Sequence, residues 1–319
     1  MRNTLNRQYS PSDTRVGLLS LPDLRKQAYA RSVDTLLQRV LGARSLRTCK
    51  VLLKPNLITA TNSSLSCSEP EIILATARWL LDQGASVMLG DSPSLGSARS
   101  VLQSLDLVSV LDFLGVEIIE MNKAEKVTLP GGQVIGVSIA ARRCDVLINL
   151  ARVKAHTQTR VTMAVKNLYG CVSGLRKGWY HMVYGGRTGN FADIIVQIPQ
   201  VLPQTVSMLG GYEAMHVTGP VRGKPFSLGI LGASINPFAL DTAFLDILGV
   251  EATTCPLHQA AIRNKILGTS LNSIEWLGAD SFQLKRSGFI VPDLLVPIRF
   301  NPFRFILSSL KRTLRPSLP

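Results

Sequence analysis

Two kinds of apolar stretch alternate along this chain. Short β-rich runs at 51–53, 87–89 and 146–150 each end at a turn, whereas longer stretches such as 24–41 carry apolar residues at helical spacing. This alternation predicts an α/β fold with a largely parallel sheet and helices on both faces. In such folds ligands bind outside the carboxyl ends of the strands, so the residues that follow each strand are the candidates for a site.

The remaining expected elements continue the alternation. Further helices are predicted over 68–84, 101–114, 191–201, 238–248 and 257–266, and further strands over 16–21, 116–119, 134–139, 206–209 and 228–231. A glycine-rich loop is predicted from Gly210 to Gly223. Since no repeat or low-complexity linker interrupts the pattern, we expect a polar leader over 1–15 and a single α/β domain over 16–299.

The last twenty residues differ in character from the rest. The segment 300–319, FNPFRFILSSLKRTLRPSLP, sets aromatic and aliphatic residues beside Arg304, Lys311, Arg312 and Arg315. This basic amphipathic tail is predicted to pack on the parent domain as a helix or arm, because its apolar run is short. Peripheral contact with a membrane surface is the alternative.

The composition of the chain indicates the chemical class of its binding partner and its cellular compartment. Of 319 residues 46% are apolar, and 35 Lys and Arg against 21 Asp and Glu give a net charge of +14, which favours an anionic partner. The five cysteines contain no CxxC pair, so neither a disulfide framework nor an iron-sulfur cluster is expected within this chain. With a polar N-terminus and no long apolar run, a cytoplasmic location is expected.

The segment 151–170, ARVKAHTQTRVTMAVKNLYG, is the richest in candidate chemistry. Its lysines have apolar neighbours, and burying an ammonium is costly unless an anion compensates it, so we expect an anion pocket formed with the strand-end residues. The expected catalytic residues are His156, Lys154, Lys166 and Asp91, and the expected ligand-binding residues are Lys54, Asn56, Ser92, Thr162, Asn167, Gly170 and His181. Alternatively, these lysines reach the surface and neutralise ordinary carboxylates.

His156 follows Lys154 by two residues, so on an extended segment the two share a face. The adjacent cation favours a neutral imidazole, which can act as a general base or as a metal ligand. His156, His181 and Asp91 are the candidates for a divalent metal, but their spacing matches no known metal signature. The metal content and the cofactor therefore stay unknown.

Several motifs together indicate a family. They are Lys54-Pro55-Asn56, Gly90-Asp91-Ser92-Pro93, the run 145–149, Lys154-Ala155-His156, the run 162–170, His181, Met215, Gly219-Pro220, Gly223 and Asp241. In these residues the sequence resembles the domain-of-unknown-function family 362 over about 51–250. The string TMAVKNLYG carries most of the specificity.

The resemblance implies redox or cofactor-related chemistry, because many members of that family carry an added ferredoxin-like domain with iron-sulfur clusters. With scattered cysteines, this chain would receive electrons from a separate ferredoxin-like protein. It also departs from the family pattern: Gly210 and His216 stand where an acidic pair is usual, so a carboxylate role is lost or Glu213 replaces it. Near the Lys-x-His segment, Arg152 and Ala155 replace a usual proline and threonine.

The leading functional hypothesis is an enzyme that binds an anionic small molecule. His156 would transfer a proton, while Lys154 and Lys166 would stabilise developing negative charge. One alternative is a nucleic-acid binder, which is disfavoured because aromatic residues make up only 6% of the chain and the basic residues are dispersed. Another is a docking or maturation factor for an acidic iron-sulfur partner.

Overall fold

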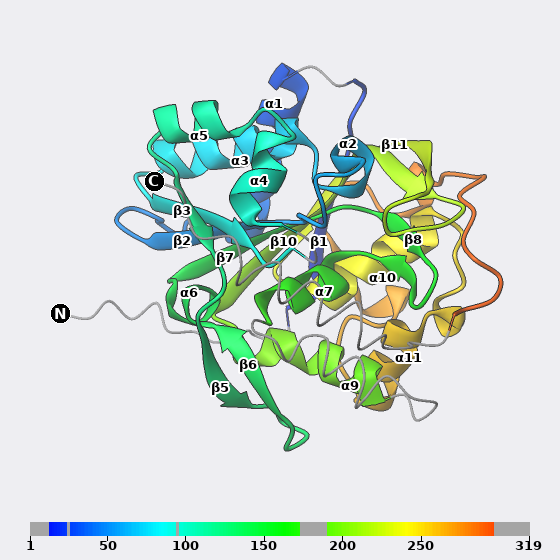
Figure 1. The fold of residues 1–319 in the computed structure, drawn as a ribbon. Helices are drawn as coiled ribbons and strands as arrows, with labels where there is room; N and C mark the ends of the chain where they lie inside the picture. The colour runs from blue at the N-terminus through cyan, green and yellow to red at the C-terminus, as the bar shows by residue number, and fades with distance from the viewer. Residues whose placement is uncertain (1–12, 24–25, 94–95, 173–189, 297–319) are drawn as a thin grey trace.

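The structure is a computed structural model that describes residues 13–23, 26–93, 96–172 and 190–296 (Figure 1). Most of the polar leader, His181 and the basic tail lie outside these residues. The domain boundaries expected from the sequence stay a prediction.

A large mixed sheet forms the centre of the molecule (Figure 1). Its strands lie in the order β12 (Glu275–Trp276), β1 (Arg15–Ser20), β11 (Lys224–Ser234), β10 (Gln204–His216), β7 (Val146–Ala151), β2 (Lys50–Pro55), β3 (Ser86–Asp91) and β4 (Glu117–Glu120). Along this path β11 is antiparallel to both of its neighbours, and every other pairing is parallel. The largely parallel sheet expected from the sequence is confirmed.

Two short strands extend the sheet beside β10. β8 (Lys154–His156) pairs with β10 in parallel, and β9 (Arg160–Thr162) pairs with β8 in the antiparallel sense. A separate hairpin of β5 (Ala124–Thr128) and β6 (Val134–Ser138) projects from the body (Figure 1). Of the two hairpin strands, β6 was predicted from the sequence, whereas β5 and the short strands β8, β9 and β12 were not.

Helices cover both faces of the sheet (Figure 1). On one face lie α1 (Lys26–Leu41), α3 (Pro70–Asp82), α4 (Ala98–Gln103) and α5 (Val108–Phe113), and on the other lie α7 (Ala164–Asn167), α9 (Asn190–Gln197), α10 (Pro237–Ile247) and α11 (Pro256–Arg263). Because side chains alternate along a strand, Val51 and Leu53 of β2 pack into the first layer while Leu52 packs into the second. Burial of both faces explains the continuous apolar runs.

The smaller helices connect these layers. They are α2 (Ser63–Ser66), α6 (Ile139–Arg143) and the 3₁₀ helices η1 (Leu168–Cys171), η2 (Ile198–Val201), η3 (Ala252–Thr254), η4 (Leu271–Ser273) and η5 (Phe282–Leu284). Capping by Asn236 fixes the start of α10. The Asn236 side chain accepts hydrogen bonds from the N–H groups of Phe238 and Ala239, and Pro237 occupies the first helical position.

The predicted glycine-rich loop is wrong over its first half. Instead, β10 continues through these residues to His216. Gly210 and Gly211 adopt φ angles of 111° and 143°, which glycine tolerates better than other residues. A Cβ at Gly210 would collide with the Ile230 carbonyl of β11. The glycines allow the two strands to approach closely. At the far end of β10, the His216 ring packs against Phe226 with a centroid separation of 5.3 Å.

The predicted helix over 101–114 is also wrong, because the structure has the two short helices α4 and α5. Asp106 between them adopts a left-handed φ of 56°. Leu105 and Leu107 on either side of it are buried like the leucines of the two helices. The apolar spacing therefore continues through the turn, and the sequence pattern does not reveal the interruption.

Candidate functional site

A buried ion pair joins the carboxyl ends of two neighbouring strands. β2 and β3 run parallel, so Lys54 near the end of one reaches Asp91 at the end of the other, with 2.9 Å between Lys54 Nζ and Asp91 Oδ1. The backbone N–H groups of Leu57 and Ser92 also donate to this carboxylate, each at 2.8 Å. Both side chains of the pair are buried, so the carboxylate of Asp91 compensates the charge of Lys54.

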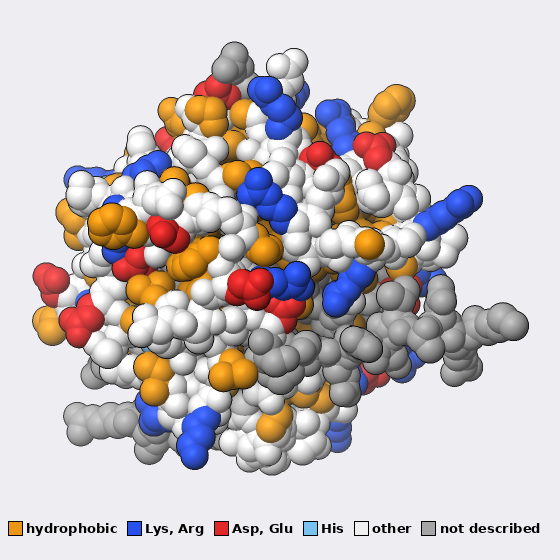
Figure 2. Space-filling view, turned by 180° about the vertical axis from the view of Figure 1, so that it is seen from behind, with side chains coloured by type: hydrophobic (Ala, Val, Ile, Leu, Met, Phe, Trp, Pro, Cys, Tyr) orange, Lys and Arg blue, Asp and Glu red, His pale blue; other side chains and the backbone are white. Residues whose placement is uncertain are grey.

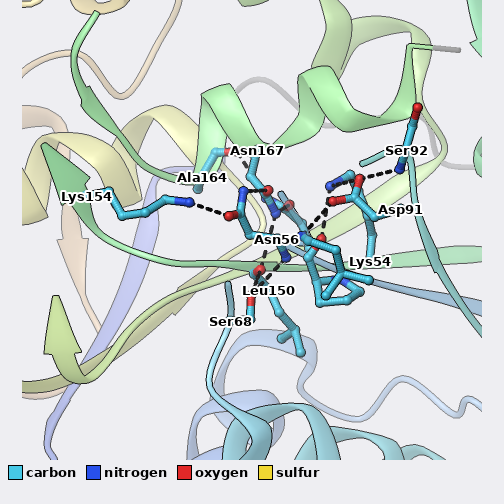
Figure 3. Close-up of polar contacts among 12 residues, drawn as sticks. Lys54, Asn56, Ser68, Asp91, Ser92, Leu150, Lys154, Ala164 and Asn167 are labelled. Atoms are coloured by element: carbon cyan, nitrogen blue, oxygen red, sulfur yellow. Dashed lines mark hydrogen bonds and ion pairs between the residues drawn. The ribbon is translucent and has the colours of Figure 1, made fainter. Parts of the chain in front are cut away.

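Three asparagine side chains form a chain of hydrogen bonds next to this pair, and two of them, Asn56 and Asn167, are labelled in Figure 3. Asn56 Nδ2 donates to Asn167 Oδ1 at 2.6 Å, and Asn167 Nδ2 donates to Asn149 Oδ1 at 2.8 Å. Asn149 Nδ2 then donates to Ser207 Oγ at 2.9 Å. All three amides are buried and partnered, so they fix α7 against the ends of β2 and β7.

Lys154 on β8 reaches the same place without a carboxylate partner. Its Nζ donates to Asn56 Oδ1 and, at 2.7 Å, to the carbonyl oxygen of Ser66, and the side chain is 0% exposed (Figure 3). Both acceptors are neutral. Burial lowers the pKa of Lys154 to about 7; the neighbouring Cys67 thiol opposes this shift, and the Arg152 guanidinium adds to it. We call Lys54, Asn56, Asp91, Lys154 and Asn167 the strand-end cluster.

Lys166 lies half-buried on α7, and its Nζ donates to Thr159 Oγ1 at 3.0 Å. Burial, together with the charge of Lys154, lowers the pKa of Lys166 well below its ordinary value. Thr159 lines a small cavity of about 20 Å³, which also contacts Asp241. A cavity of this size accommodates one water molecule or one small group of a ligand.

Asp241 holds the start of α7 in place. Its carboxyl oxygens accept hydrogen bonds from the backbone N–H groups of Ala164 at 2.7 Å and Val165 at 3.1 Å. Burial raises the pKa of Asp241 to about 8. This residue fixes the helix that carries Lys166 and Asn167.

Two buried polar groups near Lys154 have donors without acceptors. Thr162 lies directly opposite Lys154 in the β8–β9 pairing, and its Oγ1 has no partner among residues 13–23, 26–93, 96–172 and 190–296. Arg152 is 1% exposed, and its Nη1 donates to the Cys67 carbonyl at 3.2 Å and lies 3.5 Å from Glu69 Oε1. Its Nε and Nη2 have no partner within the same residues. Unpartnered buried donors are groups that a bound anion or an ordered water can satisfy.

The turn between α2 and α3 is fixed by hydrogen bonds of Ser68 and Glu69, which are not among the predicted site residues. Ser68 Oγ accepts from the Asn56 N–H and donates to the Leu150 carbonyl, both at 2.8 Å. Glu69 accepts hydrogen bonds from the Tyr29 hydroxyl and, at 2.9 Å, from the Glu213 N–H. Glu69 looks in the sequence like an ordinary helix start, and Tyr29 like an apolar position of α1, so neither carried a signal of this role.

The structure brings together five of the predicted site residues in the strand-end cluster, and Ser92 contributes its backbone N–H to Asp91. His156 shares β8 with Lys154, and its Nδ1 accepts a hydrogen bond from the Gln158 N–H at 3.0 Å, which leaves Nε2 to carry the proton of a neutral ring. His181 lies outside the described residues.

The metal expectation stays a prediction. Within the described part of the chain, no group of three or more His, Cys, Asp or Glu side chains is placed to hold a metal ion. Asp91 is engaged by Lys54, and the expected set also required His181, which is not described.

Gly170 lies against the ion pair of Lys54 and Asp91, so replacing it by alanine should destabilise the strand-end cluster. A Cβ there would collide with Asp91 Oδ1 and lie 2.5 Å from Lys54 Nζ, so we expect a loss of about 2–3 kcal/mol in the free energy of unfolding. Urea denaturation of the Gly170→Ala variant measures this loss. Gly249→Ala is a suitable control, because no atom lies within 4 Å of its Cβ, although its φ of 64° costs about 1 kcal/mol. A smaller loss for Gly170→Ala than for the control would contradict the predicted collision.

Comparisons with known proteins bear on the family. The sequence model of a family described as "Domain of unknown function (DUF362)" matches residues 51–246. A thylakoid-associated protein of Synechocystis is 34% identical over 266 residues, which cover 82% of this chain and 82% of the relative. Because the relative is named for thylakoid association, the expected cytoplasmic location is not confirmed. In the described residues, no helix combines the length and apolar character needed to cross a bilayer.

Two solved structures show more distant likeness. The lactate racemase apoprotein of Thermoanaerobacterium thermosaccharolyticum aligns with a TM-score of 0.46 and 11% identity, covering 74% of this chain. A Thermotoga maritima protein aligns with a TM-score of 0.42 and 11% identity, covering 67% of this chain. The chain spans 58% of the racemase chain and 56% of the second protein.

Proposed function

The chain belongs to the DUF362 family, and on that premise we propose that it is an enzyme-like protein that binds an anionic small molecule or cofactor beside the strand-end cluster. The observation that carries the proposal is the environment of Lys154. Its wholly buried amine has neutral acceptors, and the residue pairs across β8 and β9 with Thr162, whose hydroxyl has no partner among the described residues. An anionic group placed between these donors would compensate the charge and satisfy the hydroxyl.

The arrangement of charges supports an external anion. None of the segments outside the described residues contains Asp or Glu, so every acidic side chain of the protein has a described position. The described ion pairs engage neither Lys154 nor Lys166. This arrangement supports an anion from another molecule as the counter-charge of these two lysines.

Each residue has a role in this proposal. The pair of Lys54 and Asp91 fixes the ends of β2 and β3, while Lys154 and Lys166 stabilise negative charge on the ligand. His156, with its proton on Nε2, transfers a proton. By analogy with the family members that carry iron-sulfur domains, we place the reaction in redox or iron-sulfur-linked metabolism, with a separate ferredoxin-like protein as electron donor.

Mass spectrometry of small molecules released on denaturing the gently purified protein tests the proposal. We expect a stoichiometric anionic compound in the parent protein and none in Lys166→Met, because this change removes the ammonium and keeps the aliphatic stem. Binding of inorganic phosphate, followed through the thermal midpoint, should weaken at least about tenfold in the same variant.

Lys126→Met is the matched control, since Lys126 is exposed on β5 and its loss changes the net charge equally. Equal ligand content in the parent, Lys166→Met and Lys126→Met would remove the basis for placing the ligand here. Circular dichroism of each variant verifies that the fold is retained.

The distribution of charge disfavours the nucleic-acid alternative. Of the 35 Lys and Arg, eleven lie outside the described residues, which leaves 24 against 21 Asp and Glu in the described body. On the face in Figure 2, basic and acidic side chains are interspersed and form no basic stripe. A steep fall of oligonucleotide affinity with rising salt would favour this alternative instead.

A further inference from the structure

A surface groove on the helical layer of α1 and α3 lies apart from the strand-end cluster. It has a volume of about 580 Å³ and is lined by α1, α3 and the turn between α4 and α5. Its apolar lining comprises Ala30, Pro70, Leu74, Ala75, Trp79, Leu105 and Leu107. The groove is large enough to receive several apolar side chains of a bound segment.

The charged lining of the groove is acidic on a strongly basic protein. Four carboxylates, those of Asp34, Glu71, Asp82 and Asp106, accompany the two cations Lys26 and Arg78. Asp34 also accepts a hydrogen bond from Trp79 Nε1 at 2.9 Å, which joins an acidic group to the aromatic lining. This charge repels phosphate and anionic lipid and attracts a cationic apolar segment.

The chain itself contains a segment of this chemistry. Residues 297–319 include five basic residues and no acidic residue, and their apolar residues include Phe300, Phe303, Phe305 and Leu310. Fully extended, these residues span about 75 Å, whereas a domain of this length has a radius of gyration of about 20 Å. The segment is therefore longer than the domain is wide, which allows its later residues to reach the groove from Val296.

We propose that the C-terminal segment 297–319 docks in the groove of α1 and α3, with its aromatic and aliphatic side chains on the apolar lining and its cations near the four carboxylates. Burial of the apolar side chains supplies the main driving force, and the opposite charges set the orientation. The docked segment lies next to the turn that carries Ser68 and Glu69, because the groove begins at Pro70. Occupancy of the groove thus stabilises the start of α3.

Zero-length crosslinking of the full chain with a carbodiimide tests this proposal. Lys311 is the only lysine of the segment, so an amide between Lys311 and Asp34, Glu71, Asp82 or Asp106 identifies the docked state by peptide mass spectrometry. We expect this crosslink within the monomer, and we expect its yield to fall about fivefold or more in 1 M salt, because salt screens the charges. Lys311→Arg, which keeps the charge but cannot form the amide, is the control for peptide assignment.

Removing two groove charges gives a second readout. Asp82→Asn/Asp106→Asn should lower the crosslinking of Lys311 to the remaining Asp34 and Glu71, while the reactivity of exposed Glu117 and Glu251 stays unchanged. Crosslinks of Lys311 mainly to Glu117 or Glu251, or to a second molecule, would overturn docking within the chain. Absence of any groove crosslink, with sedimentation of the full chain on anionic vesicles, would assign the segment to a lipid surface instead.

Discussion

Asp91→Asn is expected to lower the free energy of unfolding by about 3–5 kcal/mol, because it leaves the ammonium of Lys54 buried without a counter-charge. The change keeps the size of the side chain, so the loss reflects charge and hydrogen bonding more than packing. Urea denaturation of the parent and the variant at neutral pH measures it.

The double variant Lys54→Met/Asp91→Asn should recover at least half of that loss, since no unpaired charge remains. Asp112→Asn provides a matched comparison: its ion pair with Arg99 has a distance of 2.7 Å but is exposed, and removing it should cost less than about 1 kcal/mol. If Asp91→Asn costs no more than Asp112→Asn, the buried pair does not have the assigned role.

Lys154 should make the protein more stable as the pH rises above 7. Its pKa is about 7 in the folded state against an ordinary value of 10.5, so between these values the unfolded chain binds the additional proton. Stability therefore increases with pH across this window, by up to about 5 kcal/mol from this group, while below pH 7 the penalty for the buried charge is fully present.

Lys154→Met isolates this contribution. Because Asp241 titrates in both proteins, its contribution largely cancels, and the difference in unfolding free energy between parent and variant reports Lys154 together with its coupling to Lys166. We expect the difference to shift in favour of the parent by about 3 kcal/mol between pH 6 and pH 9.5. A difference that does not vary with pH would mean that the folded-state pKa of Lys154 is ordinary.

The sequence patterns were sufficient to predict the layers of the fold and the region of the chain that contains the candidate site. Apolar runs bounded by turns place β2, β3 and β7 correctly, because strands buried on both faces have a distinctive composition. Once these strands are taken as parallel neighbours, Lys54 and Asp91 must lie close together. Proximity of Lys154 to Asn56 required the additional pairing of β8 with β10, and three-residue strands leave little pattern to read.

Partners contributed by ordinary-looking residues could not be predicted. Glu69 and Tyr29 bond to each other from the start of α3 and from α1, and nothing local in either segment marks a buried polar contact. The full length of β10 could not be predicted for a related reason. Gly210 and Gly211 suggest a loop by composition, and only the close approach of Ile230 and Glu69 explains why these positions have no side chain.

The late position of β11 in the chain, next to β1 in the sheet, determines the order in which the sheet can be completed during synthesis. β1 leaves the ribosome first, yet its partners are β11 and β12, with Gly17 paired to Ala233 and Val16 to Trp276. Until those residues have been translated, the amphipathic α1 and the edge of β1 remain without their sheet. The nascent chain thus carries an exposed strand for most of its synthesis, a period in which chaperone binding would protect it.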